Sequence, residues 1–240
     1  MLGFEAAGVV DAVGDAVTDL APGDEVAVFL PGLGGYAGLV LADLWVRKPA
    51  SVDWDAAAAL PASGEAAVRV LDQLDVTAGE TLLVLGATGS VGTVATQLTV
   101  ARGATVVAAV RRADLAVAEG YGAIPVEYGP QLGDAVRAAA GRVDAVLDAA
   151  RSSDLPAAVA MAGGPGRVVT LTNPDAAALG ATLSGPVPER IPAALAETMA
   201  ALAAGTLVLR PRAVVRLADA AGVHARLEAG TLRAKAVLAI

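Results

Sequence analysis

The chain has 240 residues, of which 55% are hydrophobic, 3% are aromatic and none is cysteine. Its formal net charge of −8 argues against a nucleic-acid partner and against anionic membranes, and the lack of cysteine excludes disulfides and cysteine zinc sites. No window reaches the roughly 18 apolar residues of a membrane span, and the N-terminus lacks the pattern of a signal peptide. We therefore expect a soluble, cytoplasmic protein.

The first fifty residues predict short β-strands separated by turns that are rich in glycine and proline. After them, a helix is expected over Asp55–Leu60, with an interruption at Pro61 and a continuation through Leu74. The expected strands of this first part are Phe4–Val13, Glu25–Leu30 and Tyr36–Leu41.

From residue 81 the pattern changes to short apolar strands that alternate with helix-length segments. This alternation is typical of a parallel sheet covered by helices on both faces, so we expect an α/β fold. The expected strands are Thr81–Leu85, Thr105–Val110, Ala123–Val126, Val143–Leu147 and Arg167–Leu171. The expected helices are Val91–Arg102, Ala113–Glu119, Gln131–Ala140, Asp154–Ala162 and Glu189–Ala204. The tail is expected to form a strand near Val208–Val215, a helix over Ala218–Glu228 and a strand over Ala236–Ile240.

The turn after Thr81–Leu85 carries the most informative motif. Gly86 would let the strand turn sharply, Gly89 would let backbone N–H groups approach a pyrophosphate, and Gly92 would let the next helix pack close to the sheet. The helix N-terminus then offers partial positive charge to the phosphates. The motif predicts a Rossmann dinucleotide-binding unit, although a tight turn without a ligand is the alternative. The candidate cofactor-binding residues are Gly86, Ala87, Thr88, Gly89, Ser90, Val91 and Gly92.

The end of the second strand of this unit distinguishes NAD from NADP. An NAD site usually has Asp or Glu there, about 20 residues past the turn, to bind the ribose 2′-hydroxyl. This chain has Arg111 and Arg112, whose guanidinium groups suit a 2′-phosphate. NADPH is therefore favoured, and two solvated surface arginines are the alternative.

Two further residues are considered as chemical groups. Glu65 lies just past the break at Pro61, where it is either a solvated residue near a helix start or an acid–base group. His224 is the only histidine and is expected to pack or cap rather than to catalyse. No spacing indicates a nucleophilic triad or a metal site.

Short motifs recur along the whole chain, and singly most of them are not specific. They include Leu2-Gly-Phe-Glu-Ala-Ala-Gly-Val-Val10, Pro22-Gly-Asp-Glu-Val26, Gly34-Gly-Tyr-Ala37, Ala57-Ala-Ala-Leu-Pro61, Gly86-Ala-Thr-Gly-Ser-Val-Gly92, Val143-Asp-Ala-Val-Leu-Asp148 and Lys235-Ala-Val-Leu238. Taken together, these motifs resemble the medium-chain dehydrogenase/reductase superfamily, in its zinc-free quinone oxidoreductase and polyketide enoyl reductase branch.

The resemblance implies a truncated GroES-like β lobe, formed by residues 1–56 and 206–240, and a Rossmann domain over residues 57–205. It places Arg111, Arg112 and Tyr128 around the adenosine phosphate, and Leu171 and Thr172 beside the nicotinamide. It also implies a homodimer joined through the edges of two Rossmann sheets.

Zinc-dependent relatives have a histidine ligand at the position of Phe4, so the resemblance implies no zinc. Several positions depart from the family pattern. The opening strands of the first lobe have no counterpart, and Glu65-Ala66 replaces a Leu-Thr pair whose threonine lies near the nicotinamide in the family. Leu115 replaces a phosphate-binding lysine, and Ala149-Ala-Arg-Ser152 replaces a glycine pair.

Three hypotheses follow. The leading one is an NADPH-dependent, zinc-free reductase of an activated C=C bond or a quinone, in natural-product metabolism. The alternative is a non-redox cyclase, isomerase or dehydratase on the same scaffold, in which cofactor binding is lost and Glu65 acts as acid or base. The third is a non-catalytic binding or accessory subunit.

Overall fold

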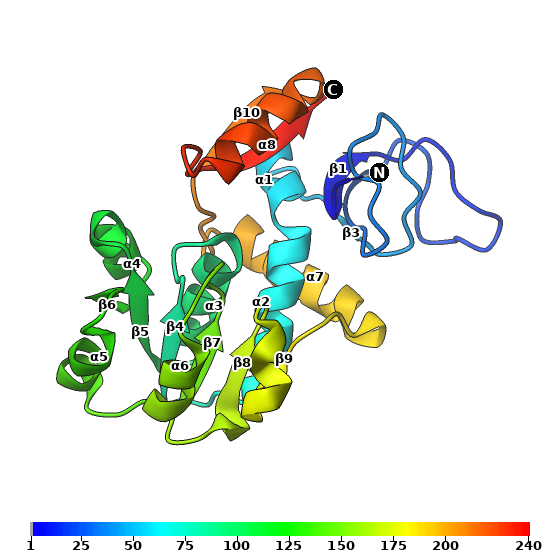
Figure 1. Ribbon diagram of the computed structural model, residues 1–240. Helices are drawn as coiled ribbons and strands as arrows, with labels where there is room; N and C mark the ends of the chain where they lie inside the picture. The colour runs from blue at the N-terminus through cyan, green and yellow to red at the C-terminus, as the bar shows by residue number, and fades with distance from the viewer. Residues whose placement is uncertain (1) are drawn as a thin grey trace. The chain divides into compact units, whose positions relative to one another are not determined.

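The computed structural model describes residues 2–240, which form two compact units. Unit 1 combines the segment up to Glu65 with Pro188–Ile240, and unit 2 is the continuous segment Ala66–Val187 (Figure 1). Each unit is described by itself.

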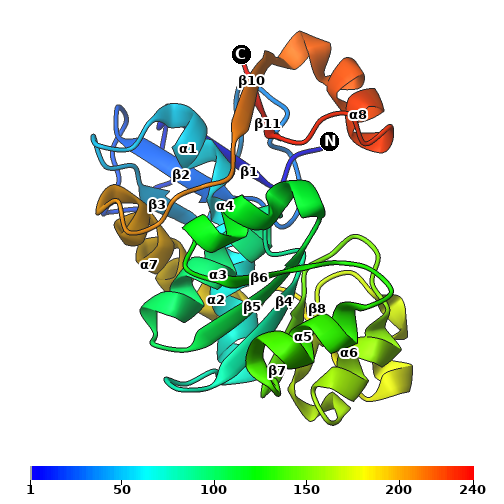
Figure 2. The same cartoon turned by 90° about the vertical axis from the view of Figure 1, so that its left-hand side faces the viewer.

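Unit 2 is built on a six-stranded parallel sheet in the order β6-β5-β4-β7-β8-β9, which Figure 1 labels and Figure 2 shows turned by 90°. In chain order this is 3-2-1-4-5-6, the strand order of the doubly wound Rossmann fold. The expected α/β fold is therefore confirmed. The strands are β4 (Thr81–Leu85), β5 (Thr105–Val110), β6 (Ile124–Glu127), β7 (Ala145–Asp148), β8 (Val168–Thr170) and β9 (Thr182–Leu183).

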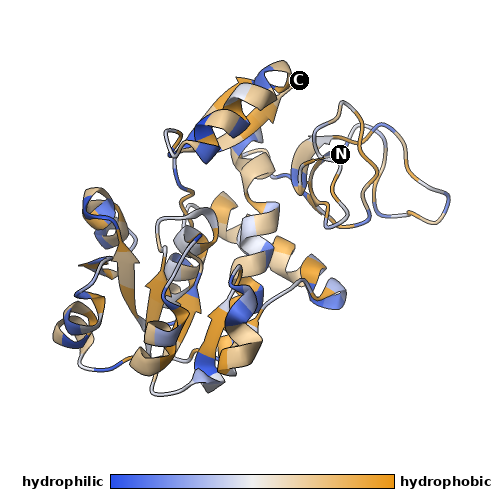
Figure 3. Cartoon of the chain, in the orientation of Figure 1, coloured by the Kyte–Doolittle hydropathy of each residue, from blue (hydrophilic) through white to orange (hydrophobic). Residues whose placement is uncertain are grey.

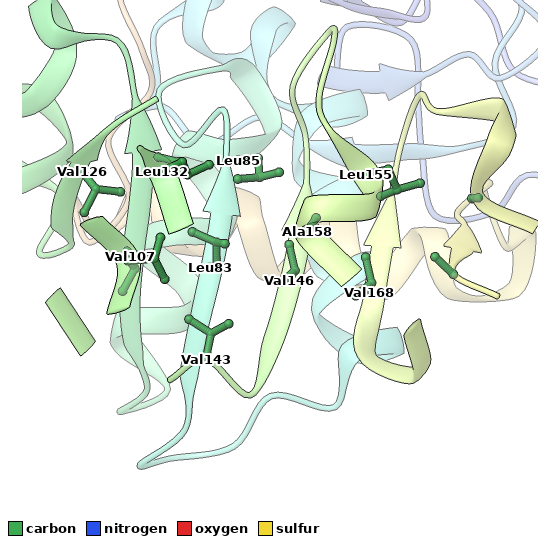
Figure 4. Close-up of a cluster of buried hydrophobic side chains, with 14 residues drawn as sticks. Leu83, Leu85, Val107, Val126, Leu132, Val143, Val146, Leu155, Ala158 and Val168 are labelled. Atoms are coloured by element: carbon green, nitrogen blue, oxygen red, sulfur yellow. The ribbon is translucent and has the colours of Figure 1, made fainter. Parts of the chain in front are cut away.

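Helices connect these strands, and both faces of the sheet are buried. On one face, Leu83 of β4 and Val107 of β5 belong to a core cluster with residues of α5 and α6, such as Val136 and Ala158 (Figure 4). On the other face, Leu82 and Val84 of β4 are also fully buried, which explains why the strands are apolar throughout (Figure 3). The helices are α3 (Ser90–Ala101), α4 (Leu115–Gly120), α5 (Leu132–Ala140) and α6 (Leu155–Met161), with 3-10 turns at Arg112–Asp114, Pro165–Arg167 and Pro174–Leu179.

Arg167, just before β8, binds the segment that leads from the end of α2 (Pro61–Leu74) to β4, and α2 is the helix that contains the boundary between the units. The Arg167 guanidinium donates to the carbonyl oxygens of Leu74 and Asp75, at 2.8 and 3.0 Å, and pairs with the Glu80 carboxylate. Glu80 also accepts from the Thr77 amide at 2.8 Å. The Arg167 guanidinium thereby lowers the pKa of Glu80 to about 2.

Unit 1 contains an antiparallel sheet in the order β1-β2-β3, a parallel pair β10-β11 and three helices of its own. The Glu5 carboxylate of β1 accepts from the Ala62 amide at 2.8 Å and pairs with Lys235 of β11, and Arg212 of β10 pairs with Asp55 of α1 at 2.7 Å. The elements are β1 (Glu5–Val9), β2 (Glu25–Phe29), β3 (Trp45–Arg47), β10 (Arg212–Arg216), β11 (Lys235–Ala239), α1 (Trp54–Ala59), α7 (Ile191–Ala203) and α8 (Ala220–Glu228), with 3-10 turns at Pro188–Arg190 and Leu217–Asp219.

One predicted strand is wrong, and one strand of the structure was not predicted. Residues Tyr36–Leu41 form no strand, because Leu39 and Leu41 are 77% and 99% exposed and the segment has no buried face. The third strand is instead Trp45–Arg47, which pairs antiparallel with Val26–Val28 of β2. The short sheet-edge strand Thr182–Leu183 was not predicted, since it has only two residues.

Candidate functional site

The carboxyl ends of the parallel strands of unit 2 are aligned, so the loops that follow them start along one edge of the sheet. There, the first residue beyond a strand donates its backbone N–H to a carbonyl of the neighbouring strand, at 2.7–3.1 Å. This row brings the candidate residues of the nucleotide site to one edge of unit 2. The donor and acceptor pairs are Tyr128 to Val110, Gly86 to Ala109, Ala149 to Leu85, Leu171 to Asp148 and Ser184 to Thr170.

The strand order reverses between β4 and β7, and ligands of open α/β sheets bind outside the carboxyl ends at such a point. Gly86, the first residue after β4, has a φ of +79°, which favours glycine. A Cβ on Gly86 would lie 3.1 Å from backbone atoms of Ala149 and Ala150, the first two residues after β7. The loops that follow β4 and β7, on either side of the point where the strand order reverses, are therefore in close backbone contact.

The other two glycines shape the start of α3. A Cβ on Gly92 would lie 2.7 Å from the Ala87 Cα and closer still to the Gly86 carbonyl oxygen, so this position admits only glycine at the observed helix–turn distance. Gly89 precedes α3 with φ −72° and ψ 174°, and no side chain caps the helix. The N–H groups of the first turn therefore remain available to an anion. A dinucleotide pyrophosphate fits this glycine-lined, uncapped helix start.

Hydrogen bonds join the loops after β7 and β8. The Asp148 carboxylate, fully buried at the end of β7, accepts from the Thr170 hydroxyl at 2.8 Å, the Ser153 hydroxyl at 2.6 Å and the Ala150 amide at 3.2 Å. The Thr172 hydroxyl donates to the Ala150 carbonyl at 2.9 Å. Sequence reasoning missed this network, and its signal was a polar residue at the end of each of two buried strands.

On the other side of β4, the residues expected to bind the adenosine phosphate follow directly after β5 and β6. The Arg111 guanidinium is held by Asp114, at 2.9 Å from Nε and 2.6 Å from Nη2. Arg112 is exposed, and the described part of the chain gives its side chain no hydrogen-bond or ion-pair partner. Tyr128, which is 38% exposed, follows Glu127, and Glu127 pairs with Val110 in the ladder, so Tyr128 lies level with Arg111. Arg112 is thus the cation that remains available to a 2′-phosphate.

Glu65 and His224 both lie in unit 1. The side chain of Glu65, in α2, is 2% exposed and interacts within the fold. The Nε2 atom of His224, in α8, lies 3.2 Å from the Tyr36 hydroxyl, which agrees with a packing role. Within residues 2–240, no three His, Cys, Asp or Glu side chains gather as a metal-ligand set.

Comparison with known proteins supports the same fold. A family profile described as zinc-binding dehydrogenase matches residues 121–238. The structure superposes on the quinone oxidoreductase of Pseudomonas syringae with a TM-score of 0.86 and 27% identity, covering 100% of this chain and 82% of that one.

Two curated relatives match shorter stretches. A pikromycin polyketide synthase component of Streptomyces venezuelae is 45% identical over 101 residues, covering 41% of this chain and 3% of that protein. An NADPH-dependent alkenal/one oxidoreductase of Arabidopsis thaliana is 38% identical over 106 residues, covering 40% of this chain and 28% of that enzyme. The chain therefore spans a small part of these curated relatives. No helix within residues 2–240 combines the length and apolarity needed to cross a membrane.

Proposed function

The chain belongs to the medium-chain dehydrogenase/reductase superfamily, in its quinone oxidoreductase-like branch, and from this premise we propose that it reduces an activated C=C bond or a quinone with NADPH. The observation that carries the proposal is the glycine turn at residues 86–92, where no side chain caps the start of α3 and the N–H groups of its first turn are open to a pyrophosphate. The relatives named above, a quinone oxidoreductase and an NADPH-dependent alkenal/one oxidoreductase, support the choice of substrate class.

In this proposal, different residues along the sheet edge of unit 2 bind different parts of NADPH. Gly86–Gly92 would hold the pyrophosphate, Arg112 and Tyr128 the adenosine 2′-phosphate, and Leu171 and Thr172 the nicotinamide side. When bound, NADPH supplies a hydride to the β-carbon of an enone or to a quinone, and a proton from a protein group or water completes the reduction. Since the chain lacks cysteine and has Phe4 where zinc-dependent relatives have a ligand, we propose that this occurs without zinc.

The direct test titrates NADPH and NADH against the purified protein and follows the fluorescence of the reduced nicotinamide. We expect saturable NADPH binding well below millimolar concentration and weaker NADH binding. NADPH consumption with a panel of enones, enoyl thioesters and quinones then identifies the acceptor. Gly89→Ala is the informative variant, because the φ and ψ of Gly89 suit alanine, while the added Cβ would lie 3.1 Å from the Gly86 carbonyl oxygen, inside the turn proposed to hold the pyrophosphate. It should keep the fold and weaken NADPH binding.

The second candidate is a non-redox cyclase, isomerase or dehydratase, and the buried Glu65 carboxylate favours it. This candidate assigns the Glu65 carboxyl group the role of general acid or base. This function requires turnover without nucleotide, and Glu65→Gln should abolish it. Turnover that depends strictly on NADPH and persists in Glu65→Gln would remove this candidate.

We also propose that the protein forms a homodimer through β9. This strand has two residues and a single neighbour, β8, so its outer edge is unpaired within unit 2. Leu183, in this strand, is 50% exposed. An exposed strand edge with an apolar side chain is a template for pairing with a second copy.

A further inference from the structure

We propose that Asp148 is a positioning residue that locks the loops after β7 and β8 into one body, and thereby fixes the nicotinamide side of the nucleotide site. This inference rests on the proposed function, because it concerns the same nucleotide site. It adds a role for a buried carboxylate that touches neither the glycine turn nor the adenosine side.

The first step concerns the chemistry of the carboxylate. A carboxylate can only accept hydrogen bonds, and three donors converge on this one: the Ala150 amide, the Ser153 hydroxyl and the Thr170 hydroxyl. The side chain is fully buried, so water does not compete for its oxygens. Two of the donors come from the loop after β7 and the third from the end of β8, so one residue holds both segments.

The second step concerns the direction of the Thr170 hydroxyl. Because Asp148 accepts, Thr170 must donate its single proton to Asp148 and keep its lone pairs free. Those lone pairs accept from the backbone amides of Thr172 at 3.3 Å and Asn173 at 3.2 Å. The Asp148 carboxylate therefore fixes the direction of the hydrogen bonds of the Thr170 hydroxyl, which donates to Asp148 and accepts from the amides of the turn after β8. An amide group at position 148 would present a donor and remove this preference.

The third step closes the network into a ring. The Thr172 hydroxyl donates to the Ala150 carbonyl, and the Ala150 amide donates back to Asp148. The ring thus runs through Asp148, Thr170, Thr172 and Ala150, and it joins the loop beside Gly86 to the turn that carries Leu171. Both loops should move together when the ring opens.

The location of the ring predicts which half of the cofactor depends on it. Leu171 and Thr172, at the end of β8, flank the nicotinamide side, whereas Arg112 and Tyr128 lie at the ends of β5 and β6, on the other side of β4. Opening the ring should therefore weaken the binding of NADPH more than the binding of its adenosine half. A loss of overall stability would weaken both ligands alike.

The test compares Asp148→Asn with Asp144→Asn, the same substitution at the opposite end of β7. Asp144 accepts from the Thr81 amide at 2.9 Å and pairs with Arg142, away from the nucleotide site. Binding of NADPH is measured beside binding of adenosine 2′,5′-bisphosphate, which lacks the nicotinamide. Amide hydrogen exchange of residues 149–154 and 171–173 reports on the loops without any ligand.

In Asp148→Asn we expect NADPH to bind about tenfold more weakly and the affinity for adenosine 2′,5′-bisphosphate to change less than twofold. We also expect the amide hydrogens of both loops to exchange faster, by a similar factor. Asp144→Asn should leave both affinities unchanged. If Asp148→Asn does not fold, Thr170→Val and Thr170→Ser replace it. The valine variant should show the same selective loss, and the serine variant, which keeps the hydroxyl, should behave like wild type.

Unchanged NADPH affinity in Asp148→Asn or Thr170→Val would overturn the inference while leaving the proposed function in place. An equal loss for both ligands would also overturn it, since a merely structural role predicts that result. A wild-type protein that binds neither ligand overturns the proposed function and the inference together.

Discussion

Replacing Gly92 by alanine is expected to destabilise unit 2 by about 2–3 kcal/mol. The added Cβ would lie 2.7 Å from the Ala87 Cα and closer to the Gly86 carbonyl oxygen. Non-bonded carbon atoms are at their best separation near 3.5–4.0 Å, so α3 must move away from the turn by about 1 Å. The atoms it meets are backbone atoms, which cannot rotate aside as a side chain would.

The assay is thermal or urea unfolding followed by far-ultraviolet circular dichroism. For a chain of this size, we expect the melting temperature to fall by about 4–12 °C. The matched control is Gly133→Ala, in α5, where a Cβ meets nothing within 4 Å. Alanine there should stabilise the protein by a few tenths of a kcal/mol to about 1 kcal/mol, because it lowers the entropy of the unfolded chain.

A melting temperature of Gly92→Ala within about 1 °C of wild type would refute this reasoning. It would mean that the helix can shift away from the turn at no cost, and that the third glycine is not required for packing. A large loss in Gly133→Ala would equally refute it, since alanine would then be harmful without a steric conflict.

Three further predictions follow from charges and edges. Because the pKa of Glu80 lies at about 2 in the folded protein instead of 4.5, its pairing with Arg167 should stabilise the fold above pH 4.5 and lose that effect as the pH falls toward 2. The side chains of Arg167 and Glu80 are 35% and 25% exposed, so Arg167→Met should lower the free energy of unfolding by about 1–2 kcal/mol at pH 7 and by less at pH 3. Urea unfolding at both pH values measures the difference. Arg112→Gln should weaken the binding of NADPH about tenfold and leave the binding of NADH unchanged. The control Arg137→Gln should alter neither affinity in the same titration. An equal loss of NADH affinity in Arg112→Gln would contradict a role for Arg112 in binding the 2′-phosphate. Leu183→Lys should convert a dimer to a monomer in light scattering, and a mass unaffected by the substitution would exclude β9 as the interface.

The sequence predicted unit 2 well because its signals are local. The apolar strands Thr81–Leu85 and Thr105–Val110 have the expected bounds, and the glycine turn occupies the predicted place between β4 and α3. Buried parallel strands are apolar along their whole length, so their limits coincide with the limits of the apolar run. The strand order, by contrast, depends on long-range pairing that no local pattern encodes.

Prediction failed where burial or long-range contact decides the outcome. The segment Tyr36–Leu41 has the composition of a strand, but it has no partner strand and its leucines are exposed. The pairing of Asp148 with Thr170 joins residues from different strands, and the partners are recognisable only once β7 and β8 are adjacent. Glu65 could be located in a helix, but its interaction depends on tertiary packing.

The central position of β4 has a consequence for synthesis on the ribosome. β4 is made before every other strand of its sheet, yet its second neighbour, β7, follows on the order of 60 residues later. At 5–20 residues per second, one edge of β4 stays unpaired for about 3–12 s of elongation. During that interval Leu82–Leu85 form an apolar edge open to foreign strands, so the nascent chain is most exposed to aggregation and to chaperones between the emergence of β4 and β7.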